Sequence, residues 1–595
     1  MSEPSIVAAP KRERTLLDYA LVAGVAVALL AFYLLRYLMR DFGFPMGPDA
    51  PVYLWWARLA AEDGLSAVSR PGVPALTLVL GGTLGISQTL VLAALGGVFG
   101  AIAGLAGAVF ASAGEGPKRW LFVVGGLLTG TFAAHLAGGY FANLVFAALF
   151  LAAAALLAST DASIAAAALF GAGGLAHPLF FVVGLVILVL TALASRRRGT
   201  SILEGDSGKV LVTAVGGGVL VGAGLAALFR GPDPPDVPTS KDGYLRRAGL
   251  EAELRAAYLE RFAQHWLRFV PFVSLPLAIA SLWKRGGFVV RFLRVWGLVA
   301  VAGVAGALIT GRGPAERFIT FAYVLPIGAT LGLAWLWRIL RPRPLAIAAT
   351  VVLVAAMIGG AVFTWAQQHP FFDAPEAEKA LVRSFDEGKP GTPILVAADA
   401  PGDAAGFEAA RVGNLYRSAV ASDRIRDVHV YIGSQKGLAK REPTFTGDSV
   451  HDALSRLTLA EIKRAAGVEP SGTKNTSPPA FSEGGDSEDF APQQPLIAGV
   501  AILVFLIVAG FGWAWVSTGG PSADALALSP AFGAAGLILV GIAAERLGLK
   551  LTGAGPAMVS GAVAVSGYLL AFLRGKEPPK WVPFRKSKPA PRIYR

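Results

Sequence analysis

Residues 39–72 concentrate polar and aromatic side chains between two long apolar segments of the chain. Two isolated carboxylates, Asp41 and Asp49, precede a run that contains Tyr53 and Trp56. A carboxylate can accept the proton of a reacting hydroxyl, and Tyr and Trp side chains anchor a segment at a bilayer surface. The pattern therefore predicts proton-transfer chemistry at a membrane–water boundary. The alternative, which the local spacing favours, is that Asp49 only caps the helix that follows it.

Three arginines could provide cations for an anionic group. Arg70 precedes a Pro-Gly-Val-Pro turn, and Arg312 and Arg317 lie five residues apart, before a later apolar segment. A guanidinium presents a fork of donors that fits phosphate oxygens, so these residues are candidates for binding a phosphate. The alternative is that they extend from helix ends into the interface, which explains most arginines at such positions.

Four polar residues lie near the ends of apolar segments: His135, Tyr140, Asn143 and His177. Polar groups at membrane depth are candidates for function, so we expect them to line a substrate cavity together with Tyr53. The alternative is that they only form hydrogen bonds between helices. The chain has no Cys, six His and no Glu-x-x-His spacing, so we predict no zinc site.

The elements that must position these residues are membrane-spanning helices. Of the 595 residues, 54% are hydrophobic and only 16% are charged, whereas soluble domains carry roughly 25% charged residues. A span needs about 20 apolar residues, and the sequence contains about 14 such segments. We therefore predict an all-α polytopic membrane bundle. The predicted spans are 16–38, 86–112, 120–138, 140–158, 163–177, 178–195, 208–229, 267–283, 291–310, 317–337, 344–365, 495–517, 524–545 and 553–573.

Membrane topology explains the net charge of +13, so we predict no nucleic-acid partner. If both termini are cytoplasmic, every short inner segment is basic, as the positive-inside bias requires. The inner basic residues are Lys118, Arg119, Arg196–Arg198, Lys284, Arg285, Arg291, Arg294, Arg338, Arg341, Arg343 and the tail after residue 573. This alternation requires two short helices within 163–195, which meet at His177 and place it at the outer surface.

A small extracytoplasmic α/β domain is predicted at 367–494. Thr392–Ala398 and Asp427–Gly433 have the composition of strands, and 449–466 has helical spacing. The predicted organisation is then a transmembrane domain at 1–366 with outer loops 39–72 and 230–268, the outer domain, further transmembrane helices at 495–573, and a basic cytoplasmic tail at 574–595. Within the second loop, 243–269 has the apolar stripe of an amphipathic surface helix.

Several segments together resemble the GT-C superfamily of membrane glycosyltransferases. The first loop, with an Asp followed by Tyr and Ala, leads into Arg70–Ser87 (RPGVPALTLVLGGTLGIS). The segments Gly138–Ala158, Leu169–Leu188 and Gly311–Leu333 are similar to later parts of that fold. The order of these elements over the first 365 residues carries the resemblance, since no single motif in it is highly specific.

The resemblance implies transfer of a sugar from a polyprenyl-phosphate donor, on the outer face of the plasma membrane, with inversion. Protein mannosyltransferases and aminoarabinose transferases are of this kind. A first-loop Asp would act as the base; Asp49 matches that position and Asp41 competes with it. The chain lacks the acidic pair found in several branches of the superfamily. The acceptor would be a glycan, a lipid or a protein, and a divalent cation held by Asp49 and the donor phosphate is a further implication.

Two other functions fit the sequence. A transporter or flippase of lipid-linked saccharides would have a similar number of spans, but such proteins usually show internal repeats and charges deep in their helices, and neither is clear here. A non-catalytic membrane scaffold with this fold is the other alternative.

Overall fold

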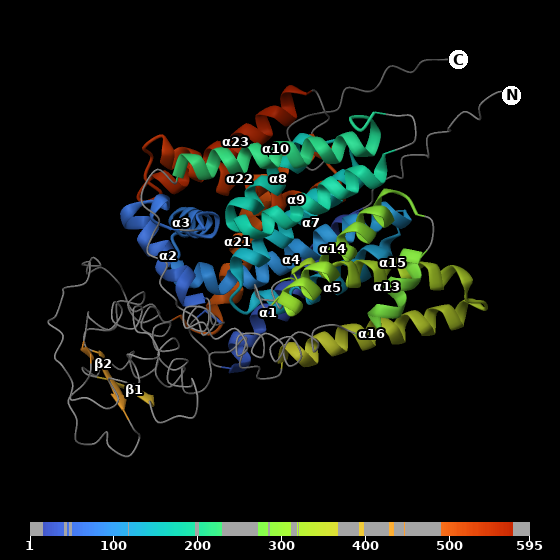
Figure 1. The fold of residues 1–595 in the computed structure, drawn as a ribbon, viewed down its shortest axis with the longest axis horizontal. Helices are drawn as coiled ribbons and strands as arrows, with labels where there is room; N and C mark the ends of the chain where they lie inside the picture. The colour runs from blue at the N-terminus through green and yellow to red at the C-terminus, as the bar shows by residue number, and fades with distance from the viewer. Residues whose placement is uncertain are drawn as a thin grey trace.

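The computed structural model describes residues 16–40, 45–46, 50–68, 70–116, 118–196, 201–228, 272–283, 286–310, 318, 320–366, 392–397, 428–433, 445–446 and 490–574. These residues form a bundle of helices, with three strands that lie apart from it (Figure 1). The amphipathic helix predicted at 243–269, the helix predicted at 449–466 and the basic tail lie outside the described residues.

Eleven helices in the described part of the chain are long and apolar enough to cross a membrane. They are α1 (Leu16–Arg40), α4 (Gln88–Glu115), α5 (Arg119–Phe132) with α6 (Ala134–Ala137), α7 (Phe141–Ser159), α9 (Pro178–Ser195), α10 (Gly205–Leu228), α14 (Phe288–Thr310), α16 (Arg343–Ala366), α21 (Gln494–Thr518), α22 (Ala523–Arg546) and α23 (Gly555–Leu573). The shorter helices are α2 (Ala50–Asp63), η1 (Leu65–Ala67), α3 (Gly72–Leu84), α8 (Ser163–Ala176), α13 (Ser274–Trp283) and α15 (Val324–Ile339).

Each of the predicted spans corresponds to a helix, so the polytopic all-α bundle is confirmed. Two of them, α13 and α15, are shorter than expected, with 10 and 16 residues in the described part of the chain. The predicted spans did not include α3, a further apolar helix of 13 residues. Its composition matches a span, but the glycine at 85, with φ 66°, ends it early.

Small residues let the central helix α4 pack closely against its neighbours. It is buried along most of its length, between α1, α5 and α7. A Cβ at Gly97 would lie 2.7 Å from Leu34 Cγ, and one at Gly107 would lie 2.5 Å from the Thr129 side chain. At these distances a Cβ would force the neighbouring side chain to shift, so the glycines allow the close approach of the helices.

The contacts at the two ends of the bundle agree with the predicted alternation of loops. At one end Arg119 pairs with Asp18 at 2.6 Å, and Arg338 with Glu115 at 2.9 Å. At the other end the first loop meets α1 and α22. We call this second end the first-loop end, after residues 39–72, and the other one the opposite end.

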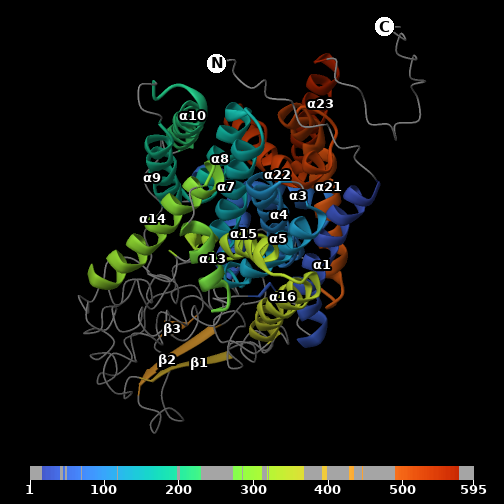
Figure 2. The ribbon, with the colours of Figure 1, turned by 90° about the vertical axis from the view of Figure 1, so that its right-hand side faces the viewer.

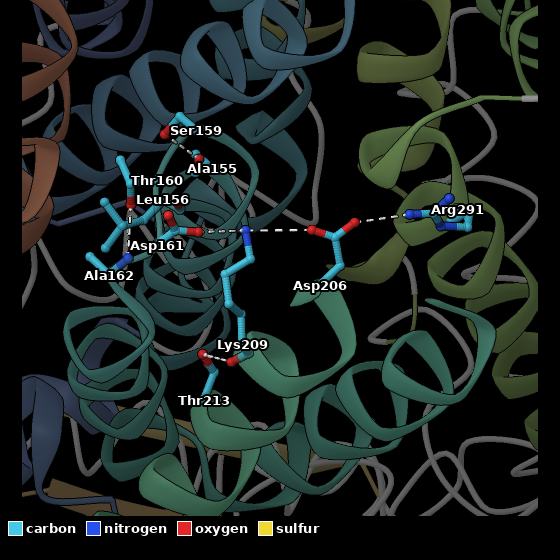
Figure 3. A network of polar contacts seen from close by, with 10 residues as sticks. All are labelled: Ala155, Leu156, Ser159, Thr160, Asp161, Ala162, Asp206, Lys209, Thr213 and Arg291. Carbon is cyan, nitrogen blue, oxygen red and sulfur yellow. Dashed lines mark hydrogen bonds and ion pairs between the residues drawn. The ribbon is translucent and has the colours of Figure 1, made fainter. Parts of the chain in front are cut away.

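A chain of four charges joins three helix ends at the opposite end (Figure 3). Lys209 lies 3.0 Å from Asp161 and 3.4 Å from Asp206, and Arg291 lies 3.0 Å from Asp206. The network therefore links the α7–α8 connection to the beginnings of α10 and α14. All four residues belong to segments predicted to lie on the same side of the membrane.

The break between α8 and α9 falls at His177, as predicted from the basic loops. His177 is only 1% exposed, so other parts of the protein cover this junction; its position on the outer side of the membrane stays a prediction. The beginning of α3 covers this point: a Cβ at Gly72 would lie 2.7 Å from Ala176 Cα. Packing of α3, which hydropathy alone does not reveal, therefore buries the junction.

The two strands predicted in 367–494 are confirmed. β1 (Thr392–Ala397) pairs in parallel with β2 (Val428–Gly433), and β2 pairs antiparallel with β3 (Phe445–Thr446). Figures 1 and 2 place these strands beyond one edge of the helix bundle. The boundaries of an α/β domain around them remain a prediction.

Candidate functional site

Tyr53 joins the first loop to the transmembrane bundle. Its side chain is 2% exposed, and its hydroxyl oxygen accepts hydrogen bonds from Arg70 Nη1 and from the backbone N–H of Ala142, both at 3.3 Å. Tyr53 comes from α2, Arg70 from the turn before α3, and Ala142 from the beginning of α7. One phenol oxygen therefore fixes three elements at the first-loop end.

Aromatic rings surround this oxygen. Tyr53 packs edge to face on Trp56 and Phe141, with ring centroids 5.3 and 5.6 Å apart. The Arg70 guanidinium carbon lies 5.8 Å from the centre of the Trp56 ring, a cation–π distance. These contacts orient the guanidinium. Because Arg70 is also partly exposed, it can still donate hydrogen bonds to an anion.

Tyr37 ties the residues after α1 to the same end of the bundle. Its hydroxyl accepts from Met46 N at 3.1 Å and lies 3.2 Å from the Ala93 carbonyl oxygen on α4. The ring also packs edge to face on Phe490, just before α21. The first loop is thus held at both ends, by Tyr37 and by Tyr53.

Asn143 lies one residue beyond Ala142 on α7 and is fully buried. Its Nδ2 lies 3.5 Å from Thr320 Oγ1, while its Oδ1 has no hydrogen-bond partner among the described residues. A buried amide oxygen without a partner is costly, and a bound polar group could satisfy it. The contact brings Thr320 close to α7; Arg317, three positions earlier in the sequence, lies outside the described residues.

His135 and Tyr140 flank the connection between α5 and α7. His135 is fully buried and its Nδ1 pairs with the Phe132 carbonyl oxygen. Its ring packs on Phe132 and lies 6.1 Å from the Tyr323 ring. Tyr140 occupies the N-cap position of α7 and is 6% exposed. The hydrogen bond of His135 is local, to a residue three positions earlier, so it is not the hydrogen bond between helices that was the alternative for this residue.

His177 caps α9. Its Nδ1 accepts the backbone N–H of Phe180 at 3.3 Å, and the two rings lie 4.2 Å apart. The acceptor role of Nδ1 means that the neutral ring carries its proton on Nε2. His177 directly follows Ala176, whose backbone is in close contact with Gly72 at the beginning of α3. Because Arg70 lies two residues before Gly72, His177 is close to the turn that carries Arg70.

The predicted site residues therefore fall into three groups. Tyr53 and Arg70 are in direct contact, and Tyr140, Asn143, His135 and His177 lie on neighbouring elements of the same end. The predicted acids Asp41 and Asp49 and the arginines Arg312 and Arg317 lie outside the described residues. Asp49 immediately precedes α2, whose first residue, Ala50, is fully buried. In the sequence, Asp49 lies four positions before Tyr53.

Two charged residues at this end were missed by the sequence reasoning. Arg36 on α1 is 3% exposed, with its guanidinium carbon 4.6 Å from the centre of the Trp365 ring. Glu545, at the end of α22, accepts a hydrogen bond from the backbone of Leu65. A charge inside the first apolar segment was an available signal for Arg36. No local signal distinguishes Glu545 from other acids at helix ends.

Within the described residues, no group of three or more His, Asp or Glu could hold a metal ion. A small cavity of about 10 Å³ lies between α5, α13, α15 and α16, lined by residues that include Phe132, Ser274 and Met357. This is about the space of one water molecule, so it is not a substrate site.

The fold and these contacts define a polytopic membrane protein with an aromatic and cationic junction at one end. No protein-family model and no curated protein matches the sequence. By structure, the chain is similar to the oligosaccharyltransferase of Archaeoglobus fulgidus. The TM-score is 0.35 for the apo form and 0.37 for the complex with zinc and sulfate, with 13% identity in each case.

The aligned region covers 63% of this chain and 58% of the apo structure, and 69% and 68% for the complex. The chain thus matches less than two thirds of the length of the apo protein.

Proposed function

We propose that this protein is a membrane glycosyltransferase of the GT-C type, which transfers a sugar from a polyprenyl phosphate to an acceptor hydroxyl. The observation that carries the proposal is the Tyr53–Arg70 contact at 3.3 Å. It holds a partly exposed guanidinium at the end of the bundle where a candidate base, Asp49, immediately precedes α2. A cation for a leaving phosphate and a proton acceptor are the two groups that this reaction needs.

The proposed reaction forms a bond between the acceptor oxygen and the anomeric carbon, and breaks the bond between that carbon and the phosphate oxygen. The acceptor proton passes to the carboxylate of Asp49, or of Asp41. The lipid phosphate leaves as an anion, paired with Arg70 and with Arg312 and Arg317. Attack opposite the leaving group inverts the anomeric centre.

In this proposal the buried polar residues contact the sugar and the acceptor. The unpaired Oδ1 of Asn143 is suited to accept from a sugar hydroxyl. The acceptor is a glycan, a lipid or a protein, and the reaction takes place on the outer face of the plasma membrane. No resident cofactor is proposed; a requirement for a divalent cation would appear as loss of transfer in EDTA.

The test uses the purified protein in proteoliposomes with a panel of polyprenyl-phosphate hexoses and pentoses. Release of free polyprenyl phosphate and formation of glycosylated product are measured for the wild type, Asp49→Asn and Asp41→Asn. We expect one Asn variant to lose transfer by at least about 100-fold, the scale of general-base catalysis, with unchanged expression. If both variants keep wild-type transfer, the assigned base is wrong. Movement of the labelled donor across the bilayer without product would favour a flippase.

A further inference from the structure

Glu545 reaches from the C-terminal helices to the first loop. It lies at the end of α22, and its Oε1 accepts a hydrogen bond from the backbone N–H of Leu65 at 2.6 Å. Leu65 is the first residue of η1, whose N-cap residue, Gly64, provides no side-chain cap. A carboxylate 480 positions away in sequence therefore caps the short helix between α2 and α3.

The loop backbone is shaped to receive this carboxylate. Gly64 has φ 89°, a conformation that favours glycine. A Cβ at this position would lie 2.5 Å from Glu545 Oε1, so the carboxylate fills the space that a side chain would need. A hydrogen bond from a backbone N–H to a carboxylate is stronger than one between neutral groups. The second oxygen, Oε2, has no hydrogen-bond partner among the described residues.

The same C-terminal helices also hold the far end of α3. Thr83 Oγ1 and Ser560 Oγ on α23 are 2.9 Å apart. A Cβ at Gly82 would lie 2.5 Å from the Pro556 ring, so α3 and α23 are in close contact there. Figures 1 and 2 show α3 beside α22. The segment that carries Arg70 is thus fixed at both sides, at Leu65 and at Thr83.

We propose that Glu545 is a positioning residue: its carboxylate holds η1, and through η1 the geometry of Tyr53 and Arg70. Its importance for catalysis rests on the proposed function, whereas its effect on the loop can be measured without any substrate. The proposal gives the C-terminal helices, which lie outside the GT-C-like first 365 residues, a definite role at the site.

The test measures the position of the loop directly. Because the chain has no Cys, spin labels can be attached at Ser66→Cys and Leu547→Cys, which are both exposed. Pulsed electron resonance in nanodiscs then gives the distribution of distances between the two labels. It is measured in the doubly labelled protein without further change and with Glu545→Ala, Glu545→Gln or Arg546→Ala added. A second pair, Leu547→Cys with Met558→Cys, reports on the C-terminal unit itself.

We expect Glu545→Ala to increase the population of displaced loop about tenfold, the effect of losing one charge-assisted hydrogen bond. Glu545→Gln keeps an acceptor oxygen and should retain most of the wild-type distribution, as should Arg546→Ala. Sugar transfer by Glu545→Ala should fall in proportion to the displaced population of the loop. Glu545→Gln should restore sugar transfer. The Leu547–Met558 distance should not change in any variant.

An unchanged Ser66–Leu547 distribution in Glu545→Ala would overturn the proposal. So would a broadened Leu547–Met558 distribution, because the effect would then be general unfolding of the C-terminal helices. Displacement of the loop with full transfer would overturn the positioning role. If Asp49→Asn and Asp41→Asn both retain transfer, only the assigned base is wrong. If the wild type transfers no sugar from any donor of the panel, the proposed function fails, and the spin-label distances still decide whether Glu545 holds the loop.

Discussion

At the scale of single residues, the Tyr53 hydroxyl determines the geometry of the candidate site. It is the common acceptor for a guanidinium and a backbone N–H from two other elements. Removing the hydroxyl leaves the buried N–H of Ala142 without an acceptor. The free energy lost in this way is larger than the average net contribution of a hydrogen bond to stability. Arg70 at the same time loses the contact that fixes its direction.

We expect Tyr53→Phe to lower the free energy of unfolding by about 1–3 kcal/mol, the cost of a buried unsatisfied donor, and to reduce transfer. Unfolding in a denaturing detergent series measures the first effect. Tyr19→Phe is the matched control, since the Tyr19 hydroxyl makes one long contact of 3.5 Å to Pro521. Equal stability of the two variants would show that Tyr53 does not fix the junction.

At the scale of elements, the approach of α3 to α8 determines whether His177 is buried. The contact depends on Gly72, since a Cβ there meets the Ala176 backbone at 2.7 Å. Backbone atoms cannot move aside as a flexible side chain can, so an added methyl group must separate the two helices. The turn that carries Arg70 would move with α3.

Gly72→Ala should therefore destabilise the protein by about 1–3 kcal/mol, the usual cost of overpacking, and reduce transfer. Gly218→Ala is the control, because no atom lies within 4 Å of its Cβ position in α10, and alanine is the better helix former. Unfolding curves of the two variants provide the comparison. A Gly72→Ala protein as stable as Gly218→Ala would contradict the close packing described for α3.

At the scale of the whole molecule, the chain divides into two ends with separate polar contacts. Asp161 is 93% exposed at the opposite end, and Ser66 is exposed at the first-loop end. The basic residues collect in segments predicted to be cytoplasmic. The two exposed residues should thus lie on opposite sides of the membrane.

Single cysteines at these positions test this orientation. A membrane-impermeant maleimide should label Ser66→Cys in intact cells, and Asp161→Cys only after the membrane is opened. The reverse pattern would place the first loop in the cytoplasm, and labelling of both from outside would contradict a bundle that spans the membrane. An immunoblot mobility shift with a large maleimide is the measurement, and expression level is its control.

The sequence by itself determined the order of the predicted spans, the break at His177 and the strands β1 and β2, because these depend on local hydropathy, turns and β-propensity. Only the tertiary structure decided which residues meet: Asn143 with Thr320, 177 positions apart, and Glu545 with Leu65, 480 apart. The physical reason is that lipid is as apolar as the helices, so hydrophobicity does not select their partners. Small residues and a few hydrogen bonds select them, and these are recognisable only when the surfaces are already together.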